Sequence, residues 1–222
     1  MKSIHVIGAG IAGQEGFTPQ ALELICQADL LIGAERLLDL FPEFPGEKMP
    51  LGKKLAEMVS RLQNCDCRAV VLASGDPLFF GVGRYLLRNL PDELIEFLPN
   101  VTSVQYAFAK IREPWDDAVF VSAHGRALKD AVDRIVANDK AAVLTDEINT
   151  PGAIARELLS RRRGGYKAYL CENLGTDEER IRVTDVKGLL EFDAAPLNVL
   201  LLIKEYEDDA HQYVPTLGIP DD

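Results

Sequence analysis

Short runs of apolar residues alternate with amphipathic stretches along most of this chain. The run Ser3–Ile7 has the form of a buried strand, and Ala69–Ala73 is the most strand-like run of the first half. Between such runs, apolar positions recur at helical spacing, as they do through residues 54–63. This alternation predicts an α/β protein with mostly parallel sheets.

The same reasoning places the other elements. Thr18 and Thr150 are each followed by proline, which predicts helices that begin at a threonine cap and run to about Gln27 and Arg162. Further helices are expected over residues 79–90, 102–111, 127–137 and 184–190. Further strands are expected over residues 30–32, 94–98, 118–122, 141–144, 167–171, 181–183 and 198–203.

A polar segment, Arg112–Asp117, interrupts this pattern. It contains Pro114, which disfavours continuation of the preceding helix. We therefore expect one α/β domain over residues 1–112 and a second over residues 113–222. The acidic, proline-rich tail from Glu207 is expected to be mobile.

Composition and charge exclude several classes of function. The 222 residues are 47% apolar, and 35 Asp and Glu against 24 Lys and Arg give a net charge of −11, which disfavours nucleic-acid substrates. No long apolar run suggests a membrane span or secretion signal, so we expect a cytoplasmic protein. The four cysteines form no Cys-x-x-Cys pair and are expected to be reduced thiols, and the three histidines show no metal-ligand spacing.

Four unusual clusters follow predicted strands. They are Gly8–Gly13, Ser74–Pro77, Ser122–Arg126 and Thr145–Asp146. Ligands of open parallel sheets bind beyond the carboxyl ends of the strands, and glycines and short acids allow a ligand to approach closely. Four such clusters in register therefore predict a binding site.

The first two clusters each have more than one interpretation. Gly8–Gly13 matches the dinucleotide pattern G-x-G-x-x-G, but the helix is expected to begin well beyond it, at Thr18, and Glu15 would repel a pyrophosphate. A dinucleotide-dependent oxidoreductase is therefore a minor alternative. Asp76 can be read as a helix cap or as a carboxylate that contacts a ligand.

These motifs resemble those of the tetrapyrrole methylases, a family of S-adenosylmethionine-dependent methyltransferases. The likeness extends from Ile4 to about Ile203 and is carried by Val6–Pro19, Ala73–Gly81, Leu98–Gln105, Ser122–Arg126, Leu144–Ala155 and Glu172–Ile181. Within the family, the H-G-R and E-N-L-G segments point to methylation of C5 of a late cobalamin precursor, precorrin-6B or cobalt-precorrin-7. The family's first loop usually reads G-x-G-P-G, whereas this chain has Ile11 and Ala12 in place of the last two residues.

The resemblance implies that S-adenosylmethionine binds in a cleft between the two α/β domains and leaves as S-adenosylhomocysteine. The implied cofactor-binding residues are Gly8, Gly10, Ile11, Gly75, Asp76, Phe79, Thr102, Ser103, Leu144, Thr145, Pro196, Leu197 and Asn198. Thr102 and Ser103 have the alternative of capping the next helix. The family is commonly dimeric, so a homodimer is expected, and a separate protein would have to methylate C15 and remove a carboxylate.

A corrin precursor carries many carboxylates, so this acidic protein needs cationic groups at the site. His124 and Arg126 are the expected substrate-binding residues, because guanidinium groups pair bidentately with carboxylates. Arg84, Arg88 and Arg112 are weaker candidates. His124 is also a candidate catalytic base, although it can equally hydrogen-bond to its own loop. Apart from this base, catalysis is expected to rest on the positioning of the methyl group and the acceptor carbon.

Two further alternatives stay open at the level of sequence. The same architecture serves methylases that act on ribosomal RNA or on an elongation factor, although the acidic balance disfavours RNA. A non-enzymatic binding module would retain the fold without the chemistry. It does not account for four clusters of glycine or acid at strand ends.

Overall fold

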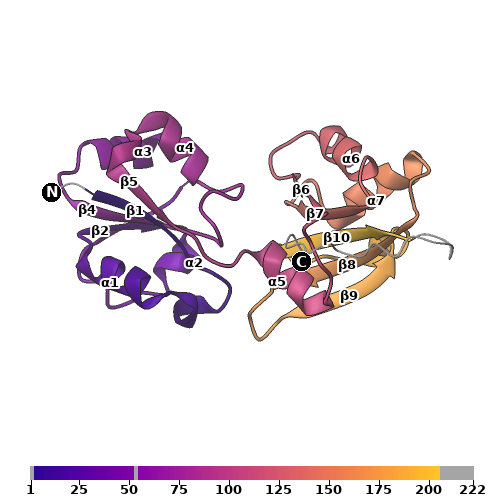
Figure 1. Cartoon of the computed structure of the whole chain (residues 1–222), viewed down its shortest axis with the longest axis horizontal. Helices are drawn as coiled ribbons and strands as arrows, with labels where there is room; N and C mark the ends of the chain where they lie inside the picture. The colour runs from indigo at the N-terminus through magenta and orange to yellow at the C-terminus, as the bar shows by residue number, and fades with distance from the viewer. Residues whose placement is uncertain (1–2, 53–54, 206–222) are drawn as a thin grey trace, which may run out of the picture.

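The computed structural model describes residues 3–52 and 55–205, which form two lobes (Figure 1). Each lobe is built on a five-stranded sheet. The strand order is β3-β2-β4-β1-β5 in the first sheet and β6-β7-β10-β8-β9 in the second. With helices packed on both sheets, the predicted α/β class is confirmed.

The first sheet is parallel throughout, as predicted. Its strands are β1 (Ser3–Gly8), β2 (Leu30–Gly33), β3 (Glu47–Pro50), β4 (Arg68–Ala73) and β5 (Ile95–Leu98). Strand β3 was not predicted, because it is short, polar and lies at the edge of the sheet, where no apolar run marks it.

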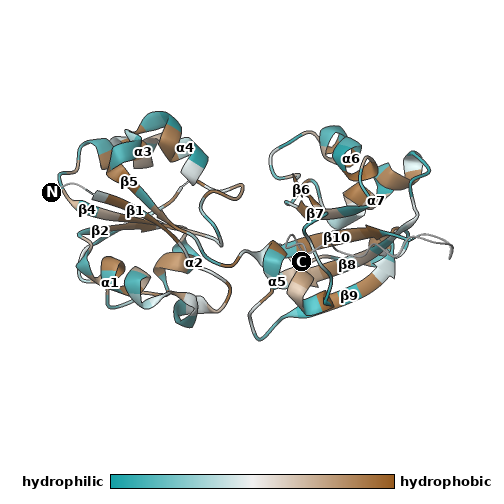
Figure 2. Cartoon of the chain, viewed as in Figure 1, coloured by the Kyte–Doolittle hydropathy of each residue, from teal (hydrophilic) through white to brown (hydrophobic). Residues whose placement is uncertain are grey.

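Helices cover both faces of the first sheet (Figure 1). They are α1 (Pro19–Gln27), α2 (Glu35–Leu38), α3 (Leu55–Gln63) and α4 (Gly83–Asn89), with 3-10 turns η1 (Gly13–Gly16) and η2 (Asp92–Leu94). Ile7 and Leu31 pack toward α1 and α2, whereas Ile4 and Val6 pack toward α3 and α4. Both faces of the strands are therefore apolar, and Figure 2 shows the sheet as a brown layer between partly teal helices.

The second sheet corrects the expectation of mostly parallel strands. Its strands are β6 (Val119–Ser122), β7 (Lys140–Leu144), β8 (Tyr166–Glu172), β9 (Arg180–Asp185) and β10 (Asn198–Lys204). The β6–β7 pair is parallel, but β10 runs antiparallel to β7 and β8, and β9 antiparallel to β8. A strand buried on both faces is a continuous apolar run in either direction, so hydrophobic patterning carries no information on its direction.

Helices α6 (Leu128–Val136) and α7 (Pro151–Ser160) and the 3-10 turn η3 (Gly188–Glu191) cover one face of the second sheet. Helix α5 (Ser103–Ile111) covers the other, where its Phe108 packs with Val199 and Leu201. Helix α5 packs on the second sheet and so belongs to the second lobe. The chain therefore crosses between the lobes at residues 99–102. The expected domain boundary at residue 112 stays a prediction.

Two predicted helices differ in the structure. Helix α4 begins only at Gly83, because residues 76–82 form a turn. The turn is tight: a Cβ on Gly81 would lie 2.5 Å from the Pro77 carbonyl oxygen. The helix expected over residues 184–190 is wrong. Strand β9 continues to Asp185, whose carboxylate accepts a hydrogen bond from the Gly188 N–H and turns the chain into η3. The tail expected to be mobile lies outside the described residues.

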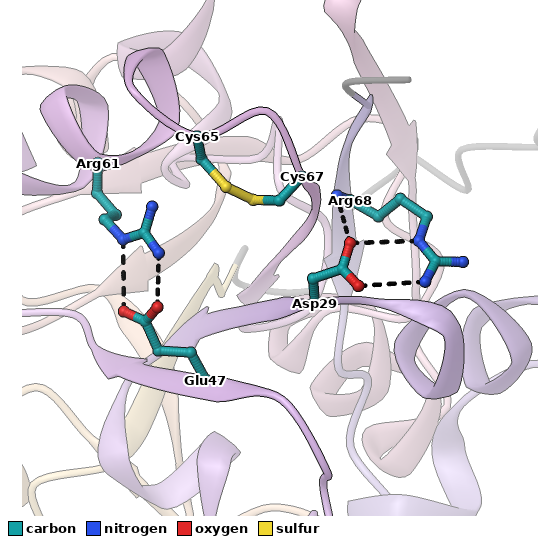
Figure 3. The surroundings of a disulfide bond; sticks show 6 residues. All are labelled: Asp29, Glu47, Arg61, Cys65, Cys67 and Arg68. Carbon is teal, nitrogen blue, oxygen red and sulfur yellow. Dashed lines mark hydrogen bonds and ion pairs between the residues drawn. A yellow bond between two sulfur atoms is a disulfide. The ribbon is translucent and has the colours of Figure 1, made fainter.

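The prediction of reduced thiols is wrong for one pair of cysteines. Cys65 and Cys67, between α3 and β4, are joined by a disulfide with their Cα atoms 5.2 Å apart. Figure 3 shows this bond between two surface ion pairs. A search for Cys-x-x-Cys misses a Cys-x-Cys pair, although its Cα separation is within the range of disulfides. Cys26 and Cys171 are free thiols.

A buried carboxylate network holds the edge of the second sheet together. Glu172 is completely buried and accepts hydrogen bonds from Arg180 and Arg182 at 2.8–3.2 Å and from the Ala195 N–H at 2.8 Å. Burial opposes ionisation of this carboxyl, but the hydrogen bonds from Arg180, Ala195 and Arg182 outweigh it and hold its pKa below the ordinary value. The network therefore ties β8 and β9 to the segment 193–197.

We expect Glu172→Gln to lower the free energy of unfolding by about 3 kcal/mol at neutral pH, because it leaves two guanidinium groups without their carboxylate. Since the folded-state pKa is lowered, this stabilisation is present above the unfolded-state pKa, about 4.3 for glutamate, and disappears as the pH falls through the folded-state pKa. Urea unfolding should therefore show a difference between variant and wild type that narrows in acid. The exposed Glu43→Gln serves as the control, and equal stability of the two variants would contradict the expectation.

Candidate functional site

A cavity of about 820 Å³ lies between the two lobes. It is bounded by the carboxyl ends of β1, β4 and β7 and by the amino end of β10, which reaches the same edge because β10 runs antiparallel to β7. Each of the four clusters that follow predicted strands contributes lining residues: Gly10, Ile11 and Gly13; Ser74 and Gly75; His124; and Thr145. The structure thus brings together residues that are far apart in the sequence.

Most of the predicted cofactor-binding and substrate-binding residues line this cavity. They are Gly10, Ile11, Gly75, Phe79, Thr102, Ser103, His124, Leu144, Thr145, Pro196, Leu197 and Asn198. Gly8, Asp76 and Arg126 are not among the lining residues. Gly8 and Asp76 make contacts within the chain, and Arg126 lies beside the Phe80 ring.

Gly8 is required by the packing of loops at the end of β1. A Cβ at this position would lie 1.9 Å from the Gly75 carbonyl oxygen and 2.9 Å from Asn100. The Asn100 side-chain amide donates hydrogen bonds to the carbonyl oxygens of Gly8, at 3.0 Å, and Gly16, at 2.9 Å. The close approach expected at Gly8 is therefore made by Asn100 and Gly75 of this chain.

Asp76 and Thr102 both serve local backbone structure. The Asp76 carboxylate accepts a hydrogen bond from the Leu78 N–H at 2.8 Å, within the turn that precedes α4. Thr102 is the N-cap of α5 and forms a capping box with Gln105, as its alternative interpretation stated. Ser103 follows in the first turn of α5 and lines the cavity, so this helix begins at the cavity wall.

The loop 122–126 is held by two polar side chains from the segment that follows β7. Asp146 accepts hydrogen bonds from the backbone N–H groups of Asn149, Gly125 and Ile148 at 2.6–2.9 Å, and these bonds hold its pKa below the ordinary value. The Asn149 amide, which is buried, donates to the carbonyl oxygens of Ala123 and Arg126 at 2.7 and 3.0 Å. The conformation of this loop is thus set from outside it.

The two predicted substrate-binding side chains differ in their surroundings. His124 lines the cavity, whereas the Arg126 guanidinium lies 5.8 Å from the ring centre of Phe80. Phe80 has a left-handed backbone with φ of 53°, which is unusual for a bulky residue and marks a conformation imposed by its surroundings.

Arg36, on the cavity wall, was missed by sequence analysis. It lies on the short helix α2, which hydrophobic spacing did not predict, and its guanidinium donates a hydrogen bond to the Ser74 hydroxyl. The surrounding protein lowers the pKa of Arg36 by desolvation, although a guanidinium stays charged at neutral pH. Among the described residues that line the cavity, none is acidic.

The segment after β8 closes another side of the cavity. A Cβ at Gly175, which has φ of 76°, would lie 2.0 Å from the Ile11 side chain, so the two loops touch across the lobes. Gly175 thus makes room for Ile11, one of the two residues that depart from the family pattern. Burial, with the charges of Glu179 and Glu172, raises the pKa of Cys171 to about 12, which excludes this lining thiol as a nucleophile at neutral pH.

The described part of the chain contains no group of three or more His, Cys, Asp or Glu placed to hold a metal ion. Its helices include none that is long and apolar enough to cross a membrane.

Comparison with known proteins identifies similar chains over almost this whole length. Residues 3–190 match the family described as Tetrapyrrole (Corrin/Porphyrin) Methylases. A cobalt-precorrin-7 C(5)-methyltransferase of Salmonella typhimurium is 38% identical, with 84% of this chain and 92% of the relative covered. A precorrin-6Y C(5,15)-methyltransferase [decarboxylating] of Sinorhizobium is 32% identical over 99% of this chain and 53% of the relative, so the chain spans about half of that protein.

A solved structure shows the same fold. It is the uroporphyrin-III C-methyltransferase of Thermus thermophilus in complex with S-adenosylhomocysteine. The TM-score is 0.70 at 24% sequence identity, and the match covers 90% of this chain and 96% of the other. At this identity the likeness concerns the arrangement of the two lobes.

We expect Asp146→Asn to loosen the loop 122–126. One carboxylate oxygen of Asp146 accepts from Ile148 and Asn149, and the other accepts from the Gly125 N–H. In asparagine an NH2 group replaces one of these oxygens and cannot accept a hydrogen bond. Loss of one charge-assisted hydrogen bond predicts about tenfold faster hydrogen exchange at the Gly125 amide. Glu147→Gln, an exposed neighbour with the same change of charge, is the matched control. Exchange at Gly125 that is equal in both variants would show that Asp146 does not hold the loop.

Proposed function

The chain belongs to the tetrapyrrole (corrin/porphyrin) methylases and is a methyltransferase, and from this premise we propose that it methylates C5 of a late cobalamin precursor, precorrin-6B or cobalt-precorrin-7, with S-adenosylmethionine as the donor. The position methylated is supported by the name of the Salmonella relative. The observation that carries the proposal is the composition of the cavity wall. In a chain with 35 acidic residues, its described lining residues include none, and they include Arg36.

An acid-free wall favours an anionic ligand. A macrocycle with several carboxylates would be repelled by a net charge of −11 unless it entered a region of opposite potential. The cavity provides such a region, and its many apolar side chains suit a large, flat organic ring. A pyrophosphate coenzyme fits less well, because α1 begins at Pro19, beyond the glycine loop, whereas in the dinucleotide motif the helix begins within that loop.

The residues of the inner cavity fit S-adenosylmethionine. Gly10 and Gly75 have left-handed backbones, with φ of 66° and 59°, so at these two positions the loops after β1 and β4 present backbone without a side chain to the cavity. The start of α5, with Ser103, suits the carboxylate of the methionine moiety, since anions are stabilised at helix N-termini. Leu144 and Leu197 would hold the adenine between the ends of β7 and β10, where Thr145 donates a hydrogen bond to Asn198 at 2.8 Å.

Catalysis by these residues consists mainly of orientation and exclusion of water. When bound, S-adenosylmethionine supplies a methyl group already activated by its sulfonium sulfur. The lining residues from both lobes would orient the acceptor carbon toward that methyl group, an effect worth several kcal/mol, up to about 7–11 in the best intramolecular reactions. Among the lining side chains, the imidazole of His124 is suited to accept the proton that leaves the macrocycle, since Cys171 stays protonated and Arg36 stays charged.

Two guanidinium groups and the N–H of one imidazole would bind the substrate's carboxylates. Arg36 lies within the cavity, His124 on its wall and Arg126 beside the Phe80 ring. Among the described residues, no carboxylate forms an ion pair with Arg36 or Arg126, so both guanidinium groups can take bidentate partners from a ligand. Arg36 is the one arginine among the described residues that line the cavity, and its hydrogen bond to the Ser74 hydroxyl orients the guanidinium.

Three expectations from the sequence accompany this proposal. We place the reaction in the cytoplasm, we expect a homodimer, and we expect a separate enzyme to methylate C15 and remove a carboxylate. The Sinorhizobium relative, about twice as long as the matched region, is named for both the C5 and the C15 positions, which supports a second activity outside the matched region.

Incubation with methyl-labelled S-adenosylmethionine and a panel of late precorrins tests the proposed reaction. We expect label at C5 of precorrin-6B or cobalt-precorrin-7, located by NMR. S-adenosylhomocysteine should raise the melting temperature and NADH should not, because only a ligand of the folded state stabilises it. Stabilisation by NADH alone, with no methyl transfer to any precorrin, would replace the proposal with the oxidoreductase alternative.

We expect Arg36→Gln to raise KM for the tetrapyrrole about ten- to a hundredfold, because it removes charge-assisted hydrogen bonds to a substrate carboxylate. The Kd for S-adenosylhomocysteine, measured by calorimetry, should stay within about twofold of wild type. Arg61→Gln, at an ion-paired arginine that is not among the lining residues, is the control. Loss of cofactor binding with KM preserved would place Arg36 against the cofactor and away from the substrate.

A further inference from the structure

A second recess of about 420 Å³ opens between the lobes beside the main cavity. Its walls come from the turn before α4, from α4 itself, from β6 and from α6. The residues that line it are Leu78, Phe79, Phe80, Arg84, Ala118, Val119, Phe120 and Arg134. Six of these eight are apolar, and the other two are arginines.

The charge of this recess is entirely positive among the described residues that line it. Arg84 is exposed and has no ion pair or hydrogen bond among the described residues, and Arg134 donates one hydrogen bond, to the Phe120 carbonyl oxygen at 2.9 Å. That bond orients the Arg134 guanidinium and leaves its other N–H groups available. Elsewhere in this acidic chain, Arg61, Arg68 and Arg161 are neutralised by carboxylates.

The recess and the main cavity share a wall. Phe79 and Phe80 line both spaces, with ring centres 4.8 Å apart in an edge-to-face arrangement. Phe79 also packs edge-to-face against Phe120 of β6, at 5.4 Å, so the partition is anchored in both lobes. A large ligand that fills the main cavity and extends past Phe80 would therefore enter the recess directly.

We propose that this recess is a subsite that binds a carboxylate-bearing side arm of the tetrapyrrole, with Arg84 and Arg134 as the two groups that recognise the carboxylate. The inference rests on the proposed function for the identity of the ligand. The aromatic and aliphatic walls contact the methylene groups of the arm, and the arginines, one from each lobe, take its charged end.

The subsite has a consequence for the geometry of the whole site. Arg84 belongs to the first lobe and Arg134 to the second, so a carboxylate between them is held by both lobes at once. This contact fixes the orientation of the macrocycle in its own plane. It thereby selects which ring carbon lies nearest the inner cavity, and it does so without touching the reacting atoms.

The test uses Arg84→Gln, Arg134→Gln and Arg134→Lys in the full chain. The matched control is Arg88→Gln, which removes the same charge one helical turn along α4; Arg88 was a weaker candidate in the sequence, but it lines neither the cavity nor the recess. With the methyl acceptor, each Gln variant should raise KM about tenfold or more and leave kcat within about threefold, while Arg88→Gln should stay near wild type. Arg134→Lys should recover part of the substrate affinity, because lysine keeps the positive charge but lacks the planar guanidinium that pairs bidentately with a carboxylate.

Binding of uroporphyrin III, a polycarboxylate tetrapyrrole, provides a readout that does not require methyl transfer. Fluorescence titration should show its Kd raised about tenfold in the Arg84 and Arg134 Gln variants and unchanged in Arg88→Gln, with S-adenosylhomocysteine affinity and melting temperature preserved. If these differences appear but no precorrin is methylated, the subsite stands and the proposed acceptor falls. Equal KM and Kd in all variants, or no binding to wild type, would overturn the subsite.

Discussion

The exclusion of carboxylates from the cavity between the lobes is the constraint on which the site depends. The chain carries a net charge of −11, and at physiological ionic strength that charge is screened over about 8 Å. A ligand close to the protein therefore experiences mainly the nearest groups. Around the two spaces between the lobes, the lining groups with a fixed charge are Arg36, Arg84 and Arg134. A polyanion near these two spaces therefore meets arginines and no lining carboxylate among the described residues.

The contrast between neutralised and free charges separates structural from ligand-binding groups. Lys140 is nearly buried and pairs with Glu113 and Asp117, both at 2.8 Å, which fastens the polar segment between α5 and β6 to the second sheet. Glu172 is buried between Arg180 and Arg182. Each of these buried charges has its counterion in the chain itself. Arg36, Arg84 and Arg134, which line the two spaces between the lobes, form no ion pair with a carboxylate among the described residues. A ligand can therefore supply their counterion.

Local chemistry could be read from the sequence, but spatial relations between distant segments could not. Thr18, Thr102 and Thr150 cap helices where expected, because each cap is a bond between a side chain and a backbone N–H three residues away. The direction of β10 depends instead on where the last strand inserts, which no local pattern encodes.

The candidate site shows the same division. Glycines and polar residues after strands pointed to the cavity, because strand ends meet at one edge of a sheet. Gly8 stays a predicted cofactor-binding residue, but the sequence did not show that the Gly75 carbonyl oxygen and Asn100, both far away along the chain, leave no room for a Cβ there. Arg36 was missed because the short helix α2 has no periodic pattern. Its significance comes from neighbours that only the fold supplies.

Asn100 also lies in the segment 99–102, where the chain passes from the first lobe to the second. Its side chain holds the carbonyl oxygens of Gly8 and Gly16, which flank the glycine loop. The same side chain therefore fixes both the point where the chain crosses between the lobes and the shape of the loop that lines the cavity.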